Sequence, residues 1–291
     1  WWRVVTELVD SSVVEPIAMR DRAKQKKALQ QRDRRRPKAC AAAAAAADAD
    51  DPTEEEEADP GMDEWRAGHL NLKKEVVVRT ANRTVRLTQD ANSSECGTVV
   101  WEVGVILARL LDAGAPPLQS CRDVAGKRVL ELGSGCGLAG LAFALRGASV
   151  CFTDLPALTP HLERNVARNL PVGVDSRTPW RVLGYDWTCA PPRSLVAGGK
   201  FDVVLATDCV YHAHLVEPFL RALKTVATTP TTTVLLMYER RDADVIATFE
   251  ARLATAFKVK RPLSASRLRK ILGDDLLARE TGVAAGDGDD D

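Results

Sequence analysis

From residue 75 onward the chain alternates between two hydrophobic patterns. Short runs that are apolar almost throughout predict buried strands, and they lie at 128–132, 149–153, 180–185, 201–207 and 233–238. Between and after these runs, apolar residues recur at helical spacing and predict helices over 138–145, 161–169, 215–226 and 244–256. Apolar strands that alternate with helices are typical of a parallel sheet covered on both faces. The pattern therefore predicts an α/β fold with a doubly wound, mostly parallel sheet.

Other patterns flank this alternating region. Residues 75–89 are two β-branched runs separated by the turn sequence ANRT, which predicts an N-terminal β-hairpin. The stretch 99–114 places five apolar residues on one helical face and ends at Gly114; they are Val103, Ile106, Leu107, Leu110 and Leu111. Residues 257–262 are a candidate for a short last strand.

The helix over 161–169 has a recognisable start. Thr159 precedes it, and its hydroxyl is of the type that caps helices, while Pro160 suits the first turn. We therefore expect Thr159 to be the N-cap of this helix.

Charge divides the chain into three parts. Residues 1–60 contain a basic block, an alanine run and an acidic block, and such a composition predicts a flexible arm. Residues 61–263 have the alternating pattern of a folded domain. Residues 264–291 read as a mainly helical remnant followed by an acidic tail. The basic block at 20–38 resembles nuclear-import and RNA-contacting patches, but we favour a solvated arm that pairs loosely with the acidic run.

Composition narrows the class of protein. The formal net charge is +0, so no global field favours a nucleic acid or a membrane surface. The seven cysteines include no C-x-x-C pair, which suits a reducing compartment. We find no apolar run of the roughly 18 residues that a membrane span needs. We therefore expect a cytoplasmic monomer, with the nucleus as a second compartment, and neither a membrane nor a nucleic acid as partner.

The candidate chemistry lies at the ends of the predicted strands, where open parallel sheets bind their ligands. The first strand ends in a glycine-rich turn, the second in Asp154, the third in Asp186-Trp187 and the fourth in Thr207-Asp208. The glycine-rich turn is Glu131-x-Gly133-Ser134-Gly135-x-Gly137, and glycines there let the backbone turn tightly against a ligand. Asp154 is placed to accept hydrogen bonds from ribose hydroxyls. Tyr211 follows three residues after Asp208.

Two nucleotides compete for this turn, because Gly135, Gly137 and Gly140 also spell the dinucleotide pattern G-x-G-x-x-G. A nicotinamide dinucleotide would use the turn and Asp154 only. S-adenosylmethionine would use all four strand ends, and its ammonium and sulfonium suit an acidic Glu131 better than a pyrophosphate would. We therefore favour S-adenosylmethionine and methyl transfer. Cys209, His212 and His214 form a C-x-x-H-x-H cluster without a fourth ligand nearby, so we predict no metal site.

Five ordered blocks resemble the family 16 methyltransferases, which are seven-strand, Rossmann-like enzymes that use S-adenosylmethionine and often methylate lysines of chaperones and elongation factors. The blocks are VVWEVGVILARLL, GKRVLELGSGCGLAGLAFALRGASVCFTDLP, LERNVARNL, YDW and ATDCVYH. The resemblance implies that Trp101 packs on the cofactor, while Trp187 and Thr207 border its adenine side. It also implies that Gly133, Ser134 and Gly135 contact the methionine part. Asp154 would take the ribose, and Asp208 and Tyr211 would lie beside the transferred methyl.

A methyl transfer needs a free lone pair, yet a lysine with its usual pKa of about 10.4 is mostly protonated at neutral pH. Our hypothesis is that Asp208 accepts a hydrogen bond from the target nitrogen and aims it, while Tyr211 shapes a narrow channel. A protein lysine is the expected acceptor. A protein histidine, a small amine, RNA, or a non-catalytic cofactor-binding role remain alternatives at this point. YERR at 238–241 is expected near the substrate channel.

Overall fold

A computed structural model describes residues 2–6, 74–79, 84–93, 95–114, 118, 121, 123–170, 180–229 and 231–257. Its larger sheet contains the strands β1 (Trp2–Thr6), β4 (Arg128–Leu132), β5 (Ser149–Asp154), β6 (Trp180–Gly184), β7 (Val203–Thr207) and β8 (Thr233–Glu239). A second sheet is the hairpin of β2 (Glu75–Arg79) and β3 (Thr84–Thr88). The helices are α4 (Glu102–Asp112), α5 (Leu138–Ala144), α6 (Thr159–Asn169), α7 (Arg193–Ala197), α8 (Val216–Val226) and α9 (Ala243–Ala256). Single 3-10 turns are η2 (Cys96–Thr98) and η4 (Ala213–Leu215).

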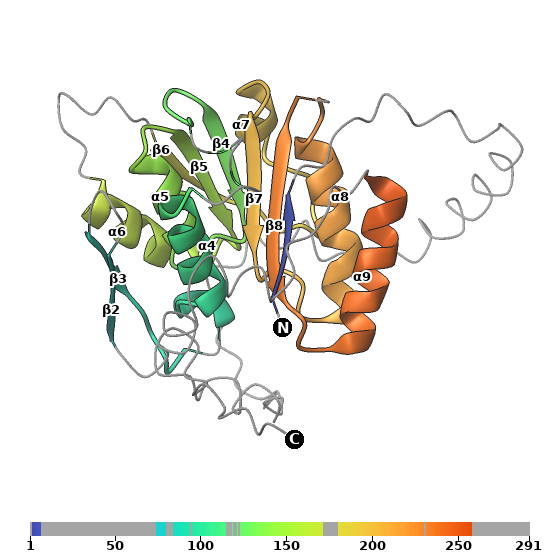
Figure 1. Ribbon diagram of the computed structural model, residues 1–291, viewed down its shortest axis with the longest axis horizontal. Coiled ribbons are helices and arrows are strands. Elements are labelled where there is room, and N and C mark those ends of the chain that lie inside the picture. The colour runs from blue at the N-terminus through green and yellow to red at the C-terminus, as the bar shows by residue number, and fades with distance from the viewer. Residues whose placement is uncertain are drawn as a thin grey trace, which may run out of the picture.

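The six-stranded sheet has the order β1-β8-β7-β4-β5-β6. β4 to β8 are mutually parallel, and β1 pairs antiparallel with β8 at one edge (Figure 1). The predicted α/β fold, its doubly wound parallel sheet and its N-terminal hairpin are thereby confirmed. Parallel neighbours require crossover helices, which explains why helices cover both faces of this sheet.

Successive side chains of the central strands enter two separate cores. On β7, Val203 and Leu205 pack into the core under α4, α5 and α6, while Val204 and Ala206 pack into the core under α7, α8 and α9. This alternation follows from the two-residue period of a strand. It explains why the strands appear in the sequence as continuous apolar runs.

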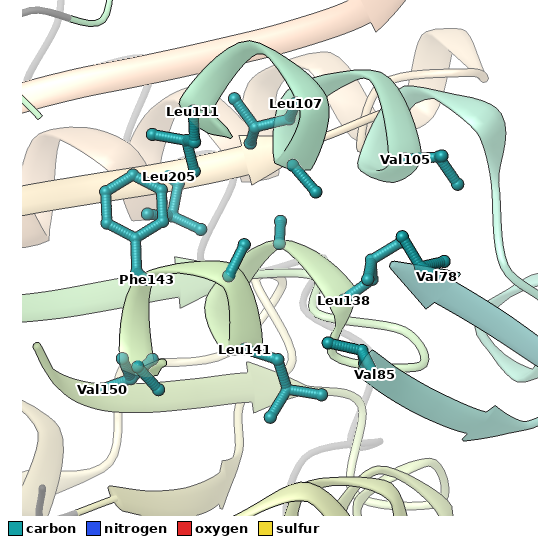
Figure 2. Packing of buried hydrophobic residues seen from close by; sticks show 14 of the residues in the cluster. Val78, Val85, Val105, Leu107, Leu111, Leu138, Leu141, Phe143, Val150 and Leu205 are labelled. Atoms are coloured by element: carbon teal, nitrogen blue, oxygen red, sulfur yellow. The ribbon is translucent and has the colours of Figure 1, made fainter. Parts of the chain in front are cut away.

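The first of these cores also holds the hairpin in place. Val78 and Val85 of the hairpin, Leu107 of α4 and Leu138 and Leu141 of α5 belong to one buried cluster (Figure 2). The outward residues of both hairpin strands are exposed, in the alternating pattern of a two-stranded sheet with one covered face. The hairpin therefore forms part of the domain.

Two local predictions need correction or extension. The N-cap of α6 is Leu158 and not Thr159, because the helix already begins at Thr159, whose hydroxyl donates to the carbonyl of Pro156. Strand β1 comes from the arm predicted to be flexible, and its pairing with β8 spans more than two hundred residues. The strand candidate at 257–262 lies almost wholly outside the described residues, and the remnant at 264–291 lies outside them entirely. Within the described part of the chain, no helix has the length and apolar character needed to cross a membrane.

Candidate functional site

The sheet order reverses direction at β4. The chain moves from β4 to β5 and β6 on one side, and then returns to β7 and β8 on the other side. Such a reversal leaves a crevice beyond the carboxyl ends of the central strands, where α/β proteins bind ligands. A cavity lies at this end of the sheet, and loops following β4, β5, β6 and β7 all contribute to its wall.

The cavity gathers eight of the eleven residues that the sequence predicted for the site. They are Trp101, Gly133, Gly135, Asp154, Trp187, Thr207, Asp208 and Tyr211. Glu131, Ser134 and Gly137 do not line it. The wall also includes residues that the sequence reasoning missed, among them Glu95, Cys96, Gly97, Leu155 and Leu158. The first three connect the hairpin to α4, and their place directly before Trp101 was the signal available in the sequence.

The turn after β4 approaches the cavity with bare backbone. Gly133 has a φ of +64°, and a Cβ at this position would lie 2.8 Å from Sγ of Cys209 and 3.2 Å from the ring of Trp187. A side chain would therefore meet neighbouring groups in a backbone conformation that L-residues rarely adopt. This geometry explains why glycine occupies the position and leaves room for a ligand beside the main chain.

Asp154 at the end of β5 joins two parts of the wall. Its Oδ2 accepts a hydrogen bond from the backbone N–H of Gly135 at 2.7 Å, and its Oδ1 accepts one from Leu155 at 2.7 Å. Burial raises the pKa of this carboxyl, and the two backbone hydrogen bonds oppose that shift. Each carboxylate oxygen can accept more than one hydrogen bond, so Asp154 retains acceptor capacity toward the cavity.

The segment after β6 supplies an aromatic wall. Trp187 packs edge-on against Phe219 of α8, with ring centroids 5.2 Å apart at an interplanar angle of 66°. Asp186 holds the turn by accepting hydrogen bonds from the N–H and hydroxyl of Thr188. Among the described residues, the indole Nε1 of Trp187 is buried and has no hydrogen-bond partner. A buried donor of this kind favours a ligand that carries an acceptor.

Asp208 follows β7 in an unusual backbone conformation. It is the single non-glycine residue with positive φ, 55°, in the described part of the chain. Its N–H donates to the carbonyl of Met237 on β8, and its Oδ1 accepts from the N–H of Glu239 at 3.2 Å. Its Oδ2 lies 2.7 Å from Nη2 of Arg241, and its side chain is only 6% exposed. Strained backbone at a cavity wall is typical of functional positions.

Burial is also the largest influence on the charge of Asp208 and Tyr211. It raises the pKa of the Asp208 carboxyl, and the neighbouring Arg241 guanidinium lowers it in part. Burial likewise raises the pKa of the Tyr211 phenol, so that side chain stays neutral throughout the physiological range.

Trp101 is the N-cap residue of α4. Its Nε1 donates a hydrogen bond to the carbonyl of Cys96 at 2.9 Å.

The expected contact of Glu131 with a ligand ammonium is not supported by its position. Its side chain is fully buried and points beneath the glycine turn, where the position of a Cβ on Gly140 would lie 2.5 Å from Oε2. Burial raises the pKa of Glu131 to about 8, so the carboxyl is largely neutral at pH 7. The physical reason is strand alternation, which turns Glu131 to the face that α5 covers.

Ser134 and Gly137 also support the turn without lining the cavity. The backbone N–H of Ser134 donates to the carbonyl of Thr153, and its hydroxyl accepts from the N–H of Thr153 at 3.1 Å. Gly137 is the N-cap of α5 with a φ of +88°. Ser134 therefore ties the turn to β5, and Gly137 leads from the turn into α5.

The wall of the cavity suits a nucleoside that carries an amino acid. The backbone cradle at Gly133, the carboxylate of Asp154 and the unpartnered indole of Trp187 all fit the adenosine and methionine groups of S-adenosylmethionine.

Among the described residues, no group of three or more histidine, cysteine or acidic side chains is arranged to hold a metal ion. The rings of His212 and His214 stack on each other, with centroids 5.5 Å apart.

Comparisons with known proteins agree with this arrangement. Residues 79–253 match the lysine methyltransferase family. The chain is 33% identical over 163 residues to protein N-lysine methyltransferase METTL21A of Danio rerio, and the match covers 55% of this chain and 70% of that protein. It is 33% identical over 146 residues to METTL21A of Mus musculus, covering 50% of this chain and 61% of that protein. It is 32% identical over 178 residues to protein-lysine N-methyltransferase EFM6 of Saccharomyces cerevisiae, covering 55% of this chain and 71% of that protein.

The family match begins at the last residue of β2 and spans β3, the glycine turn, Asp154, Asp208 and most of α9. S-adenosylmethionine is the cofactor that this family uses and that the cavity suits. The chain belongs to the lysine methyltransferase family.

Proposed function

We propose that this protein transfers a methyl group from S-adenosylmethionine to the side-chain nitrogen of a lysine in a non-histone protein. The observation that carries the proposal is the joint placement of Gly133, Asp154 and Asp208 in the wall of one cavity. The first two suit a methyl donor, and the third is a buried carboxylate at the same cavity. The proposal is also supported by relatives that are protein-lysine methyltransferases.

The donor half of the cavity is assigned to the residues after β4, β5 and β6. Gly133 and Gly135 offer bare backbone to the methionine part, Asp154 accepts from the ribose, and Trp187 borders the adenine with Thr207. Trp101 closes this half from the start of α4. The bound cofactor supplies an activated methyl group on a positively charged sulfur.

The acceptor half is assigned to Asp208 and Tyr211. In the transfer, the lone pair of the lysine nitrogen forms the new N–C bond while the C–S bond breaks and sulfur keeps its electron pair. The nitrogen must lose a proton to solvent before this step, because a lysine ammonium has no lone pair. Asp208 accepts a hydrogen bond from the nitrogen and holds it in line, which contributes through orientation. Tyr211 remains protonated and narrows the channel.

Relatives indicate a class of target protein. The curated relatives include an EEF1A lysine methyltransferase from Mus musculus, 38% identical over 89 residues. We infer that the target is a translation elongation factor or a chaperone. The seven cysteines include no C-x-x-C pair, and on this ground we propose a reducing, cytoplasmic location.

A transfer assay with labelled cofactor tests the function. The full chain is incubated with methyl-labelled S-adenosylmethionine and a eukaryotic cell extract, and the products are then treated with protease or with nuclease. We expect label that protease removes and nuclease does not, on trimmed peptides that mass spectrometry identifies as methyllysine. Asp208→Asn should abolish most of the label while binding the cofactor normally. Label on RNA, on histidine or on a small amine would contradict the proposal, and absence of cofactor binding would indicate a non-catalytic module.

A further inference from the structure

Arg241 connects residues of the cavity without lining it. Its Nη2 lies 2.7 Å from Oδ2 of Asp208, and its Nε donates to Oε2 of Glu239 at 2.7 Å. Its guanidinium also lies over the ring of Trp101, 4.6 Å from the centroid. The Arg241 side chain is only 12% exposed. The Arg241 side chain therefore joins Trp101, directly before α4, to Asp208 after β7 and to Glu239 at the end of β8.

These contacts fix a carboxylate that has little other support. Asp208 has a left-handed backbone conformation, and its Oδ1 accepts a single backbone hydrogen bond, from Glu239. The second oxygen faces Arg241. Glu239, which supplies that backbone bond, is itself paired with Arg241 through its side chain. The fork of the guanidinium can hold both acidic residues at once, which a lysine ammonium does less well.

The electrostatic surroundings of Asp208 make this cation important. Glu239 at the end of β8 and Glu102 at the start of α4 are acidic residues. Cys209 and Tyr211, on the same segment as Asp208, are neutral at physiological pH. Arg241 and the backbone N–H of Glu239 lower the pKa of Asp208, against burial and the charge of the Glu239 side chain. Without Arg241, this almost entirely buried carboxylate would lose the positive charge that lies 2.7 Å from it.

Trp101 holds the other side of the guanidinium. A cation over an indole ring is attracted by the ring quadrupole, more so where water is excluded. Trp101 is fixed in turn by its hydrogen bond to the Cys96 carbonyl. A series of contacts from Cys96 through Trp101 and Arg241 to Asp208 thus crosses from the hairpin side of the cavity to the β8 side.

We propose that Arg241 is a positioning residue for methyl transfer, and that it acts by holding Asp208 ionised and oriented toward the acceptor nitrogen. This role rests on the proposed function, in which Asp208 contacts the acceptor. Arg241 does not line the cavity, and it contacts Asp208, Glu239 and the ring of Trp101.

A matched pair of variants tests the role. Arg241→Gln removes the charge and keeps much of the side-chain length, whereas Arg241→Lys keeps the charge and loses the fork. The control is Arg240→Gln, because Arg240 is the neighbouring arginine, is 37% exposed and lies 4.0 Å from Glu250, away from Asp208. Thermal unfolding of each variant shows whether it is folded, and R241K serves if R241Q does not fold.

We expect R241Q to lower kcat at least tenfold while its affinity for S-adenosylhomocysteine changes far less. The acidic limb of its pH–rate profile should move upward by about one pH unit, because an opposite charge at this distance lowers a carboxyl pKa by about one to three units. R241K should keep the limb near its original pH and still show a reduced kcat. In an Asp208→Asn background, R241Q should lower kcat little further, since the two residues act together.

A second readout does not depend on turnover. The pKa of Asp208 can be followed by carbon-13 NMR of the labelled side-chain carboxyl, assigned with Asp208→Asn, and it should be higher in R241Q than in R240Q or the unmodified protein. If R241Q and R241K both match R240Q in kcat, in the acidic limb and in this titration, the role of Arg241 is refuted. If the unmodified protein methylates nothing, the proposed function fails, and the titration still decides whether Arg241 keeps Asp208 ionised.

Discussion

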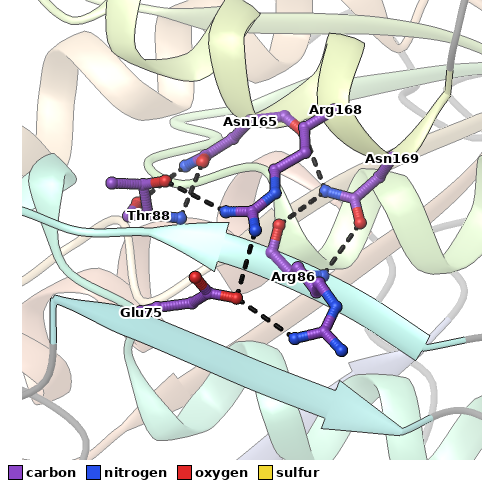
Figure 3. Close-up of polar contacts among 6 residues, drawn as sticks. All are labelled: Glu75, Arg86, Thr88, Asn165, Arg168 and Asn169. Carbon is purple, nitrogen blue, oxygen red and sulfur yellow. Dashed lines mark hydrogen bonds and ion pairs between the residues drawn. The ribbon is translucent and has the colours of Figure 1, made fainter.

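Asn165 on α6 forms with Thr88 on β3 the two hydrogen bonds that a neighbouring strand would supply. Its Oδ1 accepts from the N–H of Thr88 at 2.9 Å, and its Nδ2 donates to the carbonyl of Thr88 at 2.9 Å (Figure 3). Asn169, one helical turn later, repeats the pattern on Arg86 at 2.9 and 2.8 Å. The i, i+4 spacing of a helix here matches the i, i+2 spacing of a strand, so two amides cover the outer edge of the hairpin.

Asn165→Ala should therefore destabilise the domain. Asn165 is 1% exposed, and its loss leaves the N–H of Thr88 without its acceptor and the carbonyl without its amide donor. We expect the free energy of unfolding to fall by about 2 kcal/mol or more, as for other buried groups that lose their partners. Urea unfolding followed by circular dichroism measures the change.

Arg168→Ala is the control for this prediction, because Arg168 lies between the two asparagines and contacts the same hairpin. Its ion pair with Glu75 is 41% exposed on both sides, so solvent screens the pair and its loss should destabilise the domain far less than the loss of Asn165. Equal losses in the two variants would show that the asparagine bonds do not anchor the hairpin. Asn165→Asp keeps the acceptor and removes the donor. Its free energy of unfolding should therefore be lower than that of the unmodified protein.

Gly133→Ala should weaken cofactor binding. The new methyl group would lie 2.8 Å from Sγ of Cys209 and 3.2 Å from the Trp187 ring, in a backbone with φ of +64°. We expect the dissociation constant for S-adenosylmethionine to rise at least about tenfold, because both the strain and the displaced wall act at the binding surface. Isothermal titration calorimetry measures this constant.

Gly126→Ala separates backbone strain from the cavity. Gly126 has a similar φ of +73°, but a Cβ there meets nothing within 4 Å. It should cost about 1 kcal/mol of stability and leave cofactor binding unchanged. A loss of affinity in this variant equal to that in Gly133→Ala would mean that general destabilisation explains both.

Local patterns predicted the parallel core well, because each of its strands is buried on both faces and therefore apolar throughout. The same logic predicted that Asp154, Trp187 and Asp208 would meet, since the carboxyl ends of parallel strands share one edge. The pairing of β1 with β8 could not be predicted in this way. It joins residues more than two hundred positions apart, and five residues near the chain start carry no local sign of their partner.

The site shows the same division between local and long-range information. Sequence reasoning placed the YERR segment near the substrate channel, but it gave no sign that Arg241 would meet both Asp208 and Trp101. The face to which Glu131 points was readable from alternation, because Leu130 and Leu132 pack into the core on the other face. Its acidic character suggested a ligand contact, whereas burial leaves it largely neutral.

Glu131 makes the stability of the domain depend on pH. Burial raises the pKa of Glu131 to about 8 in the folded protein, from 4.5 in the unfolded chain. The folded state thus keeps a proton that the unfolded state releases between these values. Stability from this group is fully present below about pH 4.5 and falls as the pH rises through about 8, by about 5 kcal/mol in total.

Glu131→Gln tests this dependence, because it replaces the titratable carboxyl with an amide of nearly the same shape that does not ionise. Its free energy of unfolding should lack the decline that the unmodified protein shows between pH 5 and 8. Glu131→Gln should therefore become more stable relative to the unmodified protein as the pH rises. Urea unfolding at several pH values measures the difference. A constant difference across this range would show that Glu131 is ionised in the folded protein, and would restore the possibility of a charged contact with the cofactor.

Tyr211→Phe addresses whether the phenol loses its proton during turnover. Burial is the largest cause that raises the pKa of Tyr211, and the phenol is therefore neutral under all ordinary assay conditions. We expect the alkaline limb of the pH–rate profile to be unchanged in Tyr211→Phe, with kcat lowered by less than about tenfold, because the ring still fills the channel wall. The affinity for cofactor should also be unchanged.

Tyr211→Ala provides the comparison, since it removes the ring as well as the hydroxyl. It should lower kcat much more than Tyr211→Phe does, because a widened channel no longer confines the acceptor nitrogen in line with the methyl group. Steady-state kinetics from pH 6 to 10 on the identified target protein measures both effects. Disappearance of the alkaline limb in Tyr211→Phe would instead show that turnover requires the protonated phenol, and the role of Tyr211 would change from shaping the channel to donating a hydrogen bond or a proton.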